Sequence, residues 1–425
     1  MEDRRLATTV VGTVSVAHFV SHVFLLAYPP LFPLLASEFD VSTARLGLLV
    51  TAIYVPQLLL QLPLGEAVDR IGAKWVLVAG LFVTSVSIGG SGLATTYWML
   101  LGFALMSGIG QSVFHPADYA LLESVTTPDT EGTAFSAHTF GGFAGFAAAP
   151  LAIGTVGIAA GWDVALLAAG AVGAVLAVAI GITMEPVHTR RIRSDSEPDT
   201  SSEDDVTSTV DDADPTSDGA RSEANSETAG TLRQFVAFLR RTDLLLVFLF
   251  YLVSMMALVG LQSFTTVLAV EEYGLTESNA NTLLTVHLTS TAVGVIAGGP
   301  LANRASFRWV VVGLFGLSAV SVWTLVLVPV TTGFAVALVV LGLVGVLVGL
   351  ALPSRDRFAN AVVDPDAVGK SFGFFFTGLS LGAVVSPALL GGIIDRWSAA
   401  VAFLVVGLFL AVAASIVVVA AHREP

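Results

Sequence analysis

The chain contains no cysteine, and Lys74 and Lys370 are its only lysines. The absence of thiols excludes disulfide bonds and thiolate chemistry. Charged residues are also scarce: they make up 12% of the 425 residues, whereas hydrophobic residues make up 55% and the mean hydropathy is +0.83. This composition excludes a soluble globular protein and gives nucleic-acid binding no support.

Two catalytic signatures are missing as well. The sequence has no Gly-x-x-x-x-Gly-Lys loop for nucleotide phosphates and no H-E-x-x-H pair for a catalytic zinc ion. We therefore expect no cofactor, no metal and no enzymatic activity. A receptor would be expected to carry a folded soluble domain, and the sequence offers none.

Long apolar runs dominate what is present. A helix needs about 20 apolar residues to cross the hydrocarbon core of a bilayer, and about twelve runs qualify. They cover 7–33, 43–64, 73–94, 97–122, 133–158, 163–184, 236–269, 278–302, 308–330, 333–353, 369–394 and 397–421. The sequence therefore predicts an all-α membrane protein with twelve transmembrane helices.

Basic residues predict the orientation of these helices. If the N-terminus is cytoplasmic and twelve helices alternate in direction, only Arg45 and Arg396 of the 19 basic residues fall outside. Basic residues concentrate on the cytoplasmic side of membrane proteins. We expect a multi-pass protein of the cell membrane with both termini in the cytoplasm.

A charged segment occurs twice in the chain. The first copy, residues 65–74, joins two apolar runs, and the second begins at Gly299, 234 residues after Gly65. We expect both to be loops that gate a conformational change, in which the glycines permit sharp turns and the charges form releasable contacts. The gating residues of the two copies are Gly65, Asp69, Arg70, Gly72, Lys74, Arg304 and Arg308. Asn303 replaces the aspartate in the second copy, so that copy can cap a helix but cannot form the same ion pair.

The spacing of residues 65–74 resembles the loop signature of the major facilitator superfamily. That resemblance implies two pseudo-symmetric six-helix bundles with a central path lined by helices one, four, seven and ten. It also implies transport by alternating access. The bundles are expected at 1–185 and 232–425, joined by an acidic disordered cytoplasmic linker at 186–231. Residues 195–230 hold twelve acids against the single base Arg221, and such a composition cannot form a packed core.

Polar residues within the apolar runs are candidates for the transport path. His18 and His22 lie four residues apart in the first run, and Gln57 and Gln61 have the same spacing in the second, so each pair shares a helix face. The histidines are either protonatable groups beside a cavity or neutral packing residues. The glutamines either line the path or bond neighbouring helices. Gln262 and His287 are the corresponding candidates in the second half.

The fourth run contains a His-Pro step followed by an acid, at His115, Pro116 and Asp118. Proline frees a backbone carbonyl four residues earlier, so His115 either satisfies that carbonyl or pairs with Asp118 for proton transfer. We expect Asp118 and its counterpart in the second half, Arg355, to lie near the inner mouth and to reach water.

The first and fourth runs together are similar to those of the fosmidomycin-resistance group of exporters. Shared features are the Phe-His-Pro step at 114–116 and a histidine ahead of a Tyr-Pro pair at 28–29. Two departures matter. Ala117 stands where that group has a glutamate, with the acid one position later at Asp118. Ala104 stands where the wider superfamily often has an arginine.

Small residues recur in the fifth and eleventh runs. A glycine strip before Pro150 resembles the antiporter signature Gly-x-x-x-Gly-Pro, with Ala149 in place of the second glycine. A matching strip precedes Pro387, 237 residues later. Such strips allow close helix contact and prolines bend helices. The strip residues are Gly141, Gly145, Pro150, Gly382 and Pro387.

These observations lead to one function and one alternative. We expect a monomeric, proton-coupled exporter of small molecules, such as drugs, that contacts membrane lipid and carries protons on His18, His22, His115 and Asp118. The alternative is an uptake symporter for a small organic or inorganic solute. Uptake of an anion is disfavoured at this stage, because no arginine or lysine lies near the middle of any run.

Overall fold

The computed structural model describes residues 2–185, 237–327, 333–363 and 368–423. Within these residues the helices are joined by short turns, and twelve helical segments are long and apolar enough to cross a membrane. The all-α fold with twelve spans is therefore confirmed. The linker expected at 186–231 lies outside the described residues.

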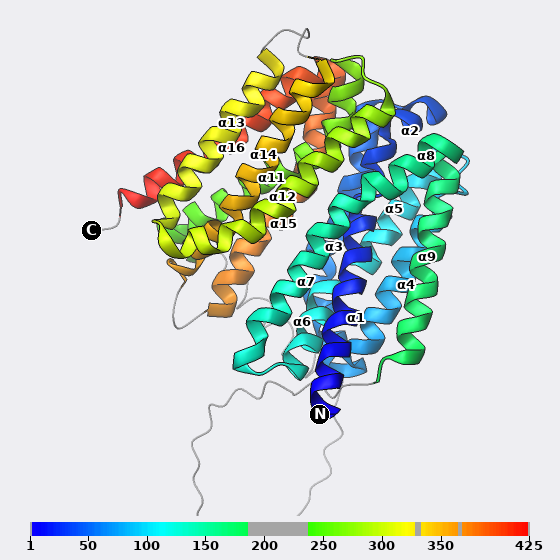
Figure 1. Cartoon of the computed structure of the whole chain (residues 1–425), viewed down its shortest axis with the longest axis vertical. Coiled ribbons are helices and arrows are strands. Elements are labelled where there is room, and N and C mark those ends of the chain that lie inside the picture. Colours follow the sequence, from blue (N-terminus) through cyan, green and yellow to red (C-terminus); the bar gives the residue numbers. More distant parts are fainter. Residues whose placement is uncertain (1, 186–236, 328–332, 364–367, 424–425) are drawn as a thin grey trace, which may run out of the picture.

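The helices of the first half run from Glu2 to Thr183 (Figure 1). They are α1 (Glu2–Leu25), η1 (Pro29–Leu31), α2 (Phe32–Phe39), α3 (Thr43–Ile71), α4 (Ala73–Ser91), α5 (Tyr97–Gln111), α6 (Phe114–Val125), α7 (Pro128–Ala149), η2 (Pro150–Gly154), α8 (Thr155–Ala160) and α9 (Trp162–Thr183). Those of the second half are α11 (Thr242–Glu271), α12 (Glu277–Arg304), α13 (Phe307–Leu327), α14 (Gly333–Asn360), α15 (Val368–Arg396) and α16 (Ala399–Ala421).

The two halves repeat the same helix pairings. In the first half α1 packs on α7, α3 on α5 and α4 on α9; in the second α11 packs on α15, α12 on α14 and α13 on α16. These pairs occupy corresponding places along the chain, and Figure 1 shows the halves as two sets of roughly parallel helices. The duplicated sequence segments thus belong to two halves whose helices pack in the same pairs.

Two spans of the first half change helix type at a proline, whereas Pro56, Pro63, Pro300, Pro353 and Pro387 lie inside continuous α-helices. The first span unwinds after Leu25 and continues as a short 3-10 turn that begins at Pro29, as expected from the Tyr-Pro-Pro run. In the fifth span α7 gives way to a π-helical turn that begins at Pro150. Because proline lacks an N–H group, the regular helix cannot continue through it without losing a hydrogen bond.

The first charged segment is not a loop, contrary to expectation. Gly65, Asp69 and Arg70 belong to the last two turns of α3, and the chain reverses at Gly72 alone, where φ is +95°. Gly72 suits this conformation because it has no Cβ. The second copy likewise ends a helix, α12, but turns at Ala305 with an ordinary extended backbone.

The glycine strips hold each half together. A Cβ on Gly145 would lie 2.2 Å from the carbonyl oxygen of Phe19 in α1, and one on Gly382 would lie 2.3 Å from that of Leu252 in α11. The strips therefore set the α1–α7 and α11–α15 contacts, which are both internal to one half.

We expect Gly145→Ala to destabilise the protein by about 1–3 kcal/mol, because the added methyl would collide with backbone and push α1 from α7. Gly65→Ala is the matched control: its Cβ would meet no atom within 4 Å, and it lies inside a helix. That change should be neutral or stabilising. Thermal unfolding of the two purified variants checks this, and a lower Tm for Gly65→Ala than for Gly145→Ala would contradict it.

Contacts between the halves gather at the end of the molecule where α3 begins and α15 ends, which we call the closed end. There the N–H groups of Thr43 and Ala44 donate to the two carboxylate oxygens of Asp395, at 2.8 and 3.0 Å. The backbones of α3 and α15 also approach closely, since a Cβ on Gly47 would lie 2.2 Å from the carbonyl oxygen of Pro387.

Two further hydrogen bonds join the halves at the closed end. Thr266 of α11 donates to the carbonyl of Pro29 at 2.9 Å, and Asn281 of α12 donates to that of Pro30 at 3.1 Å. Both carbonyls belong to the 3-10 turn η1, where that of Pro29 also accepts from the N–H of Phe32. The break in the first span thus serves the contact between the halves.

Candidate functional site

The fourth span is interrupted next to its His-Pro step. Helix α5 ends at Gln111, Ser112 and Val113 form a turn, and α6 begins at Phe114. Pro116 has no N–H to continue the hydrogen-bond ladder, and the Ser112 hydroxyl donates back to the carbonyl of Gly108 at 2.8 Å. As a result α6 starts afresh and presents its first turns to α1 and α7.

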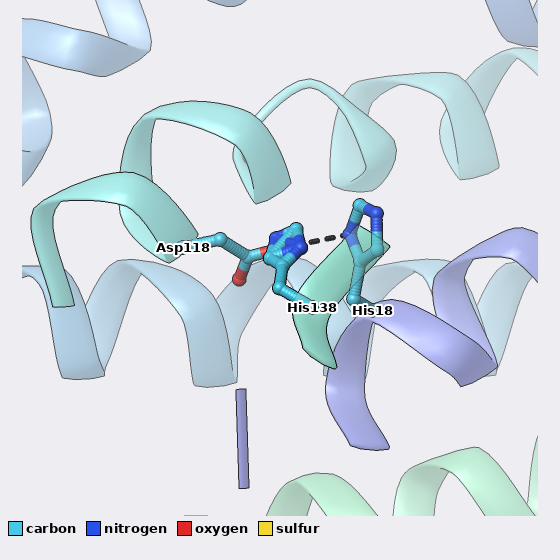
Figure 2. A group of neighbouring side chains, drawn as sticks. All are labelled: His18, Asp118 and His138. Carbon is cyan, nitrogen blue, oxygen red and sulfur yellow. Dashed lines mark hydrogen bonds and ion pairs between the residues drawn. The ribbon is translucent and has the colours of Figure 1, made fainter. Parts of the chain in front are cut away.

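Asp118 of α6 is the centre of the site. Its Oδ2 lies 3.0 Å from Nδ1 of His18 on α1 and 3.2 Å from Nε2 of His138 on α7. Figure 2 shows the three side chains converging from their separate helices. The Asp118 side chain has no exposed surface, and both histidines are buried. Three helices of one half therefore meet on a single buried carboxylate oxygen.

Two more histidines extend this site. The ring centroids of His18 and His22 are 4.3 Å apart, and those of His18 and His115 are 5.8 Å apart. Tyr119 lies 5.9 Å from His115 and 5.8 Å from His138 between ring centroids. We call Asp118 and these four histidines (18, 22, 115 and 138) the histidine cluster.

The cluster is not wholly enclosed, and His22 is half-buried. His115 is exposed, and so is Tyr119, at 44%. Their rings contact those of His18 and His138, which in turn bind the carboxylate. An unbroken series of titratable or hydroxyl-bearing rings thus leads from an exposed surface to Asp118.

Glycine makes room for the cluster. A Cβ on Gly142 of α7 would lie 2.2 Å from Nδ1 of His22 and 2.8 Å from Nε2 of His18. The two imidazoles therefore fill the space that a side chain at position 142 would need. A pair of hydrogen bonds between α1 and α5 also fixes the position of α1. Ser21 donates to the Gln111 side chain at 2.9 Å, and that side chain donates to the Ser21 carbonyl at 2.8 Å.

The cluster differs from expectation in two respects. The spacing of His115 and Asp118 suggested that they pair, but the hydrogen bonds of Asp118 go to α1 and α7 instead. Asp118 was also expected to reach water and is fully buried. His18 and His22 do share a helix face, as their ring contact shows.

Sequence reasoning missed His138. It lies in the fifth span, three and seven residues before Gly141 and Gly145, and so on the same helix face as the glycine strip that packs on α1. Because that strip face was already identified, a histidine on it could have been assigned to the α1–α7 contact.

Other candidate path residues lie apart from the cluster. Gln57 donates to the carbonyl of Ile53 in its own helix at 3.1 Å, and Gln61 and Gln262 are half-buried. Nδ1 of His287 lies 3.2 Å from the carbonyl oxygen of Leu341, which ties α12 to α14 within the second half. His287 therefore has the surroundings of a packing residue.

The charged segments make local contacts in this conformation. Arg70 pairs with Glu66 one turn earlier at 3.4 Å, with both side chains exposed, and Asp69 is exposed. The buried Lys74 ammonium lies 4.5 Å from the ring centroid of Trp75. In the second copy the Arg304 side chain is exposed, and the guanidinium of Arg308 lies 5.1 Å from the ring centroid of Phe307. Asn303 accepts a 3.4 Å hydrogen bond from Arg357 of α14.

Arg355 of α14 is more enclosed than expected. Its side chain is 15% exposed, its guanidinium lies 5.0 Å from the ring centroid of Tyr251, and its Nε donates to Asp356 at 2.9 Å. Tyr251 donates to the same Asp356 oxygen at 3.0 Å. Arg355 is thus an enclosed, hydrogen-bonded cation, whereas sequence analysis expected its side chain to lie near the inner mouth and to reach water.

His18, Asp118 and His138 also have the residue types of a metal site. Each offers one ligand atom, and the three atoms lie within 4.8 Å of one another. Imidazole and carboxylate suit zinc, and in this structure the nitrogens lie 3.0 and 3.2 Å from Oδ2, at hydrogen-bonding distance. The arrangement in the structure is therefore that of a hydrogen-bonded triad.

Comparison with known proteins agrees with this architecture. A model of the Major Facilitator Superfamily matches residues 14–280 and 245–425. The fosmidomycin resistance protein of Escherichia coli K12 is 23% identical over 395 residues, which cover 93% of this chain and 88% of that protein. Multidrug resistance protein 1 of Bacillus subtilis is 28% identical over 130 residues, which cover 31% of this chain and 33% of that protein.

The fold is similar to that of a crystal structure described as a bacterial homolog of the human lysosomal transporter Spinster, in an inward-facing and occupied conformation. The TM-score is 0.76 at 14% sequence identity, and the match covers 98% of this chain and 97% of the other.

Proposed function

The chain belongs to the Major Facilitator Superfamily, and we propose that it is a proton-coupled exporter of small molecules. It is a multi-pass membrane protein and a secondary transporter, not an enzyme. Coupling to protons, the direction of transport and the orientation in the membrane belong to the proposal.

The observation that carries the proposal is the buried Asp118 between two imidazoles. An ionised carboxylate without exposed surface is costly unless a cation or strong donors compensate for its charge. Within the described residues its hydrogen-bond partners are histidines, which can be neutral or cationic. A state in which Asp118 is ionised and all its imidazole neighbours are neutral is therefore unfavourable. The favoured states hold one additional proton. That proton sits either on the acid or on a ring.

Proton binding would also rearrange the hydrogen bonds. When Asp118 is ionised, His18 and His138 can both donate to Oδ2. When Oδ2 carries the proton, at least one ring must turn its lone pair toward it or move away. Because the two rings belong to α1 and α7, the protonation state of one oxygen bears on how two helices of the first half pack.

Proton exchange would take place through His115 and Tyr119, the exposed members of the ring series. Following the distribution of basic residues, we assign the closed end to the outer face, so this route opens toward the cytoplasm. Export is favoured over uptake by the glycine strip ahead of Pro150 and by the names of the distant relatives. Alternating access would then exchange the contacts at the closed end for contacts at the opposite end.

Arg355 favours a second candidate, the transport of a small anion, in either direction. Sequence analysis disfavoured anions because no arginine or lysine lies near the middle of an apolar run. In the structure, however, Arg355 is largely enclosed and lies against Tyr251. Its Nε is bound by Asp356, and its terminal nitrogens are the donors suited to a carboxylate, phosphate or phosphonate.

The test is transport by purified full-length protein in proteoliposomes, with fosmidomycin as an anionic probe and ethidium as a cationic one. For a proton-coupled exporter, an acidic lumen should drive accumulation of the transported probe, and an entrapped pH dye should report lumenal alkalinisation. An effect only of acid outside the vesicles would identify a symporter. Transport at the same rate with an acidic lumen, an acidic exterior or no pH gradient would contradict proton coupling.

A further inference from the structure

A groove of about 410 Å³ runs along the outside of the first half, between α3 and α5. Its surface is almost wholly apolar. The lining residues are Leu48, Thr51 and Ala52 of α3 and Leu101, Gly102 and Leu105 of α5. Leu48 and Leu105 are 39% and 44% exposed, so the groove is an open surface feature and not an enclosed cavity.

Gly102 shapes the floor of this groove. A Cβ placed there would meet no atom within 4 Å, which contrasts with Gly108 in the same helix, where a Cβ would lie 2.4 Å from the carbonyl oxygen of Ile53. Gly108 is therefore needed for packing between α5 and α3, whereas Gly102 leaves an open space. Helix contact alone does not explain a glycine at position 102.

A cation and two aromatic rings stand at one end of the groove. The guanidinium of Arg45 lies 5.7 Å from the ring centroid of Tyr97 and 6.0 Å from that of Trp98, which also lines the groove. The Tyr97 hydroxyl donates to the carbonyl of Arg45 at 2.8 Å and so fixes the start of α3 against the start of α5. No carboxylate pairs with Arg45 in the part of the chain that the structure describes.

We propose that this groove is a phospholipid site, in which one acyl chain lies along the groove and the lipid phosphate binds Arg45. Tyrosine and tryptophan at the start of the spans mark the level of the lipid headgroups. A guanidinium at that level is well suited to a phosphate because it presents several donors in one plane. Polar recognition at one end and apolar surface along the rest match the two parts of a phospholipid.

The site touches the contact between the halves. Thr43 and Ala44, which bind Asp395 of α15, immediately precede Arg45 in the first turn of α3. Thr51, which lines the groove, donates to the carbonyl of Val384 in α15 at 2.9 Å. A lipid in this groove therefore contacts the helix that links the two halves at the closed end.

Native mass spectrometry of the full-length protein, titrated with dioleoyl phosphatidylglycerol, tests the proposal. The wild type should bind a first lipid more tightly than later ones. Arg45→Gln should weaken that first binding about fivefold, the effect of one basic residue at a membrane surface. Gly102→Leu should weaken it at least as much, because the new side chain fills the groove.

Each variant has a matched control outside the groove. Arg396→Gln removes an exposed arginine that lies 5.4 Å from the ring centroid of Trp397, and Gly313→Leu fills an open position on α13. Both controls should bind the first lipid as the wild type does. Glycerol 3-phosphate, which lacks an acyl chain, should not displace the lipid. Equal binding by all five proteins, loss in Arg45→Gln alone, or displacement by glycerol 3-phosphate would each overturn the proposal.

Discussion

Asp118→Asn should abolish proton-driven transport, lowering the initial rate at least 100-fold. Asparagine has nearly the shape of aspartate, so the contacts of Oδ2 with His18 and His138 at 3.0 and 3.2 Å can largely be kept. Asparagine lacks the negative charge of aspartate. Without that charge, a proton bound among the surrounding imidazoles is no longer stabilised. The fold should persist while the exchange of charge stops.

The measurement separates these two effects. Proton-driven accumulation of the transported probe should disappear, while exchange of labelled for unlabelled probe without a gradient should persist, since exchange requires only that the loaded carrier turns over. His287→Gln is the control, because His287 is equally buried but bonds a backbone carbonyl in the second half. Proton-driven accumulation near the wild-type rate in Asp118→Asn would refute the assignment of the proton to this cluster.

Sequence reasoning succeeded here where the physical signal is local. Hydropathy over about 20 residues identifies a span whatever surrounds it, and the unwinding near Pro29 follows from the missing N–H of proline. The repeat could be found because two copies of one sequence spacing survive. In the same way, the contact between His18 and His22 follows from helix periodicity alone.

The hydrogen-bond partners of Asp118 could not be predicted from the sequence in this way. His18 is 100 residues away and His138 is 20 residues away, so their meeting depends on how α1, α6 and α7 are rotated about their axes. Sequence spacing shows only neighbours three or four positions apart, which is why His115 was chosen. Gly65 was misassigned for a related reason: a glycine can signal a turn, but α3 continues through it to Ile71, and a helix accommodates an internal glycine at a cost of about 1 kcal/mol.

Asp395 supplies a charge-assisted contact between the halves. Its two carboxylate oxygens accept hydrogen bonds from the first N–H groups of α3, which are also where the helix dipole favours a negative charge. Because the pair is exposed, we assign it about 1.4 kcal/mol, near the lower limit for a charge-assisted bond. The contact is broken when the closed end opens. Its full free energy therefore favours the conformation in which that end is closed.

Asp395→Ala should therefore raise the population open at this end about tenfold. Because the chain has no cysteine, Ala149→Cys can report this directly: Ala149 is fully buried in an apolar cluster with Leu26, Leu284 and Leu288 from both halves. In that background, Asp395→Ala should accelerate modification by a membrane-impermeant maleimide about tenfold. Glu272→Ala is the control, since Glu272 also accepts from a helix N–H, that of Ala400 at 2.9 Å, but within the second half. If Glu272→Ala accelerates labelling as much as Asp395→Ala does, the effect is local loosening and the Asp395 contact does not set the equilibrium between the two conformations.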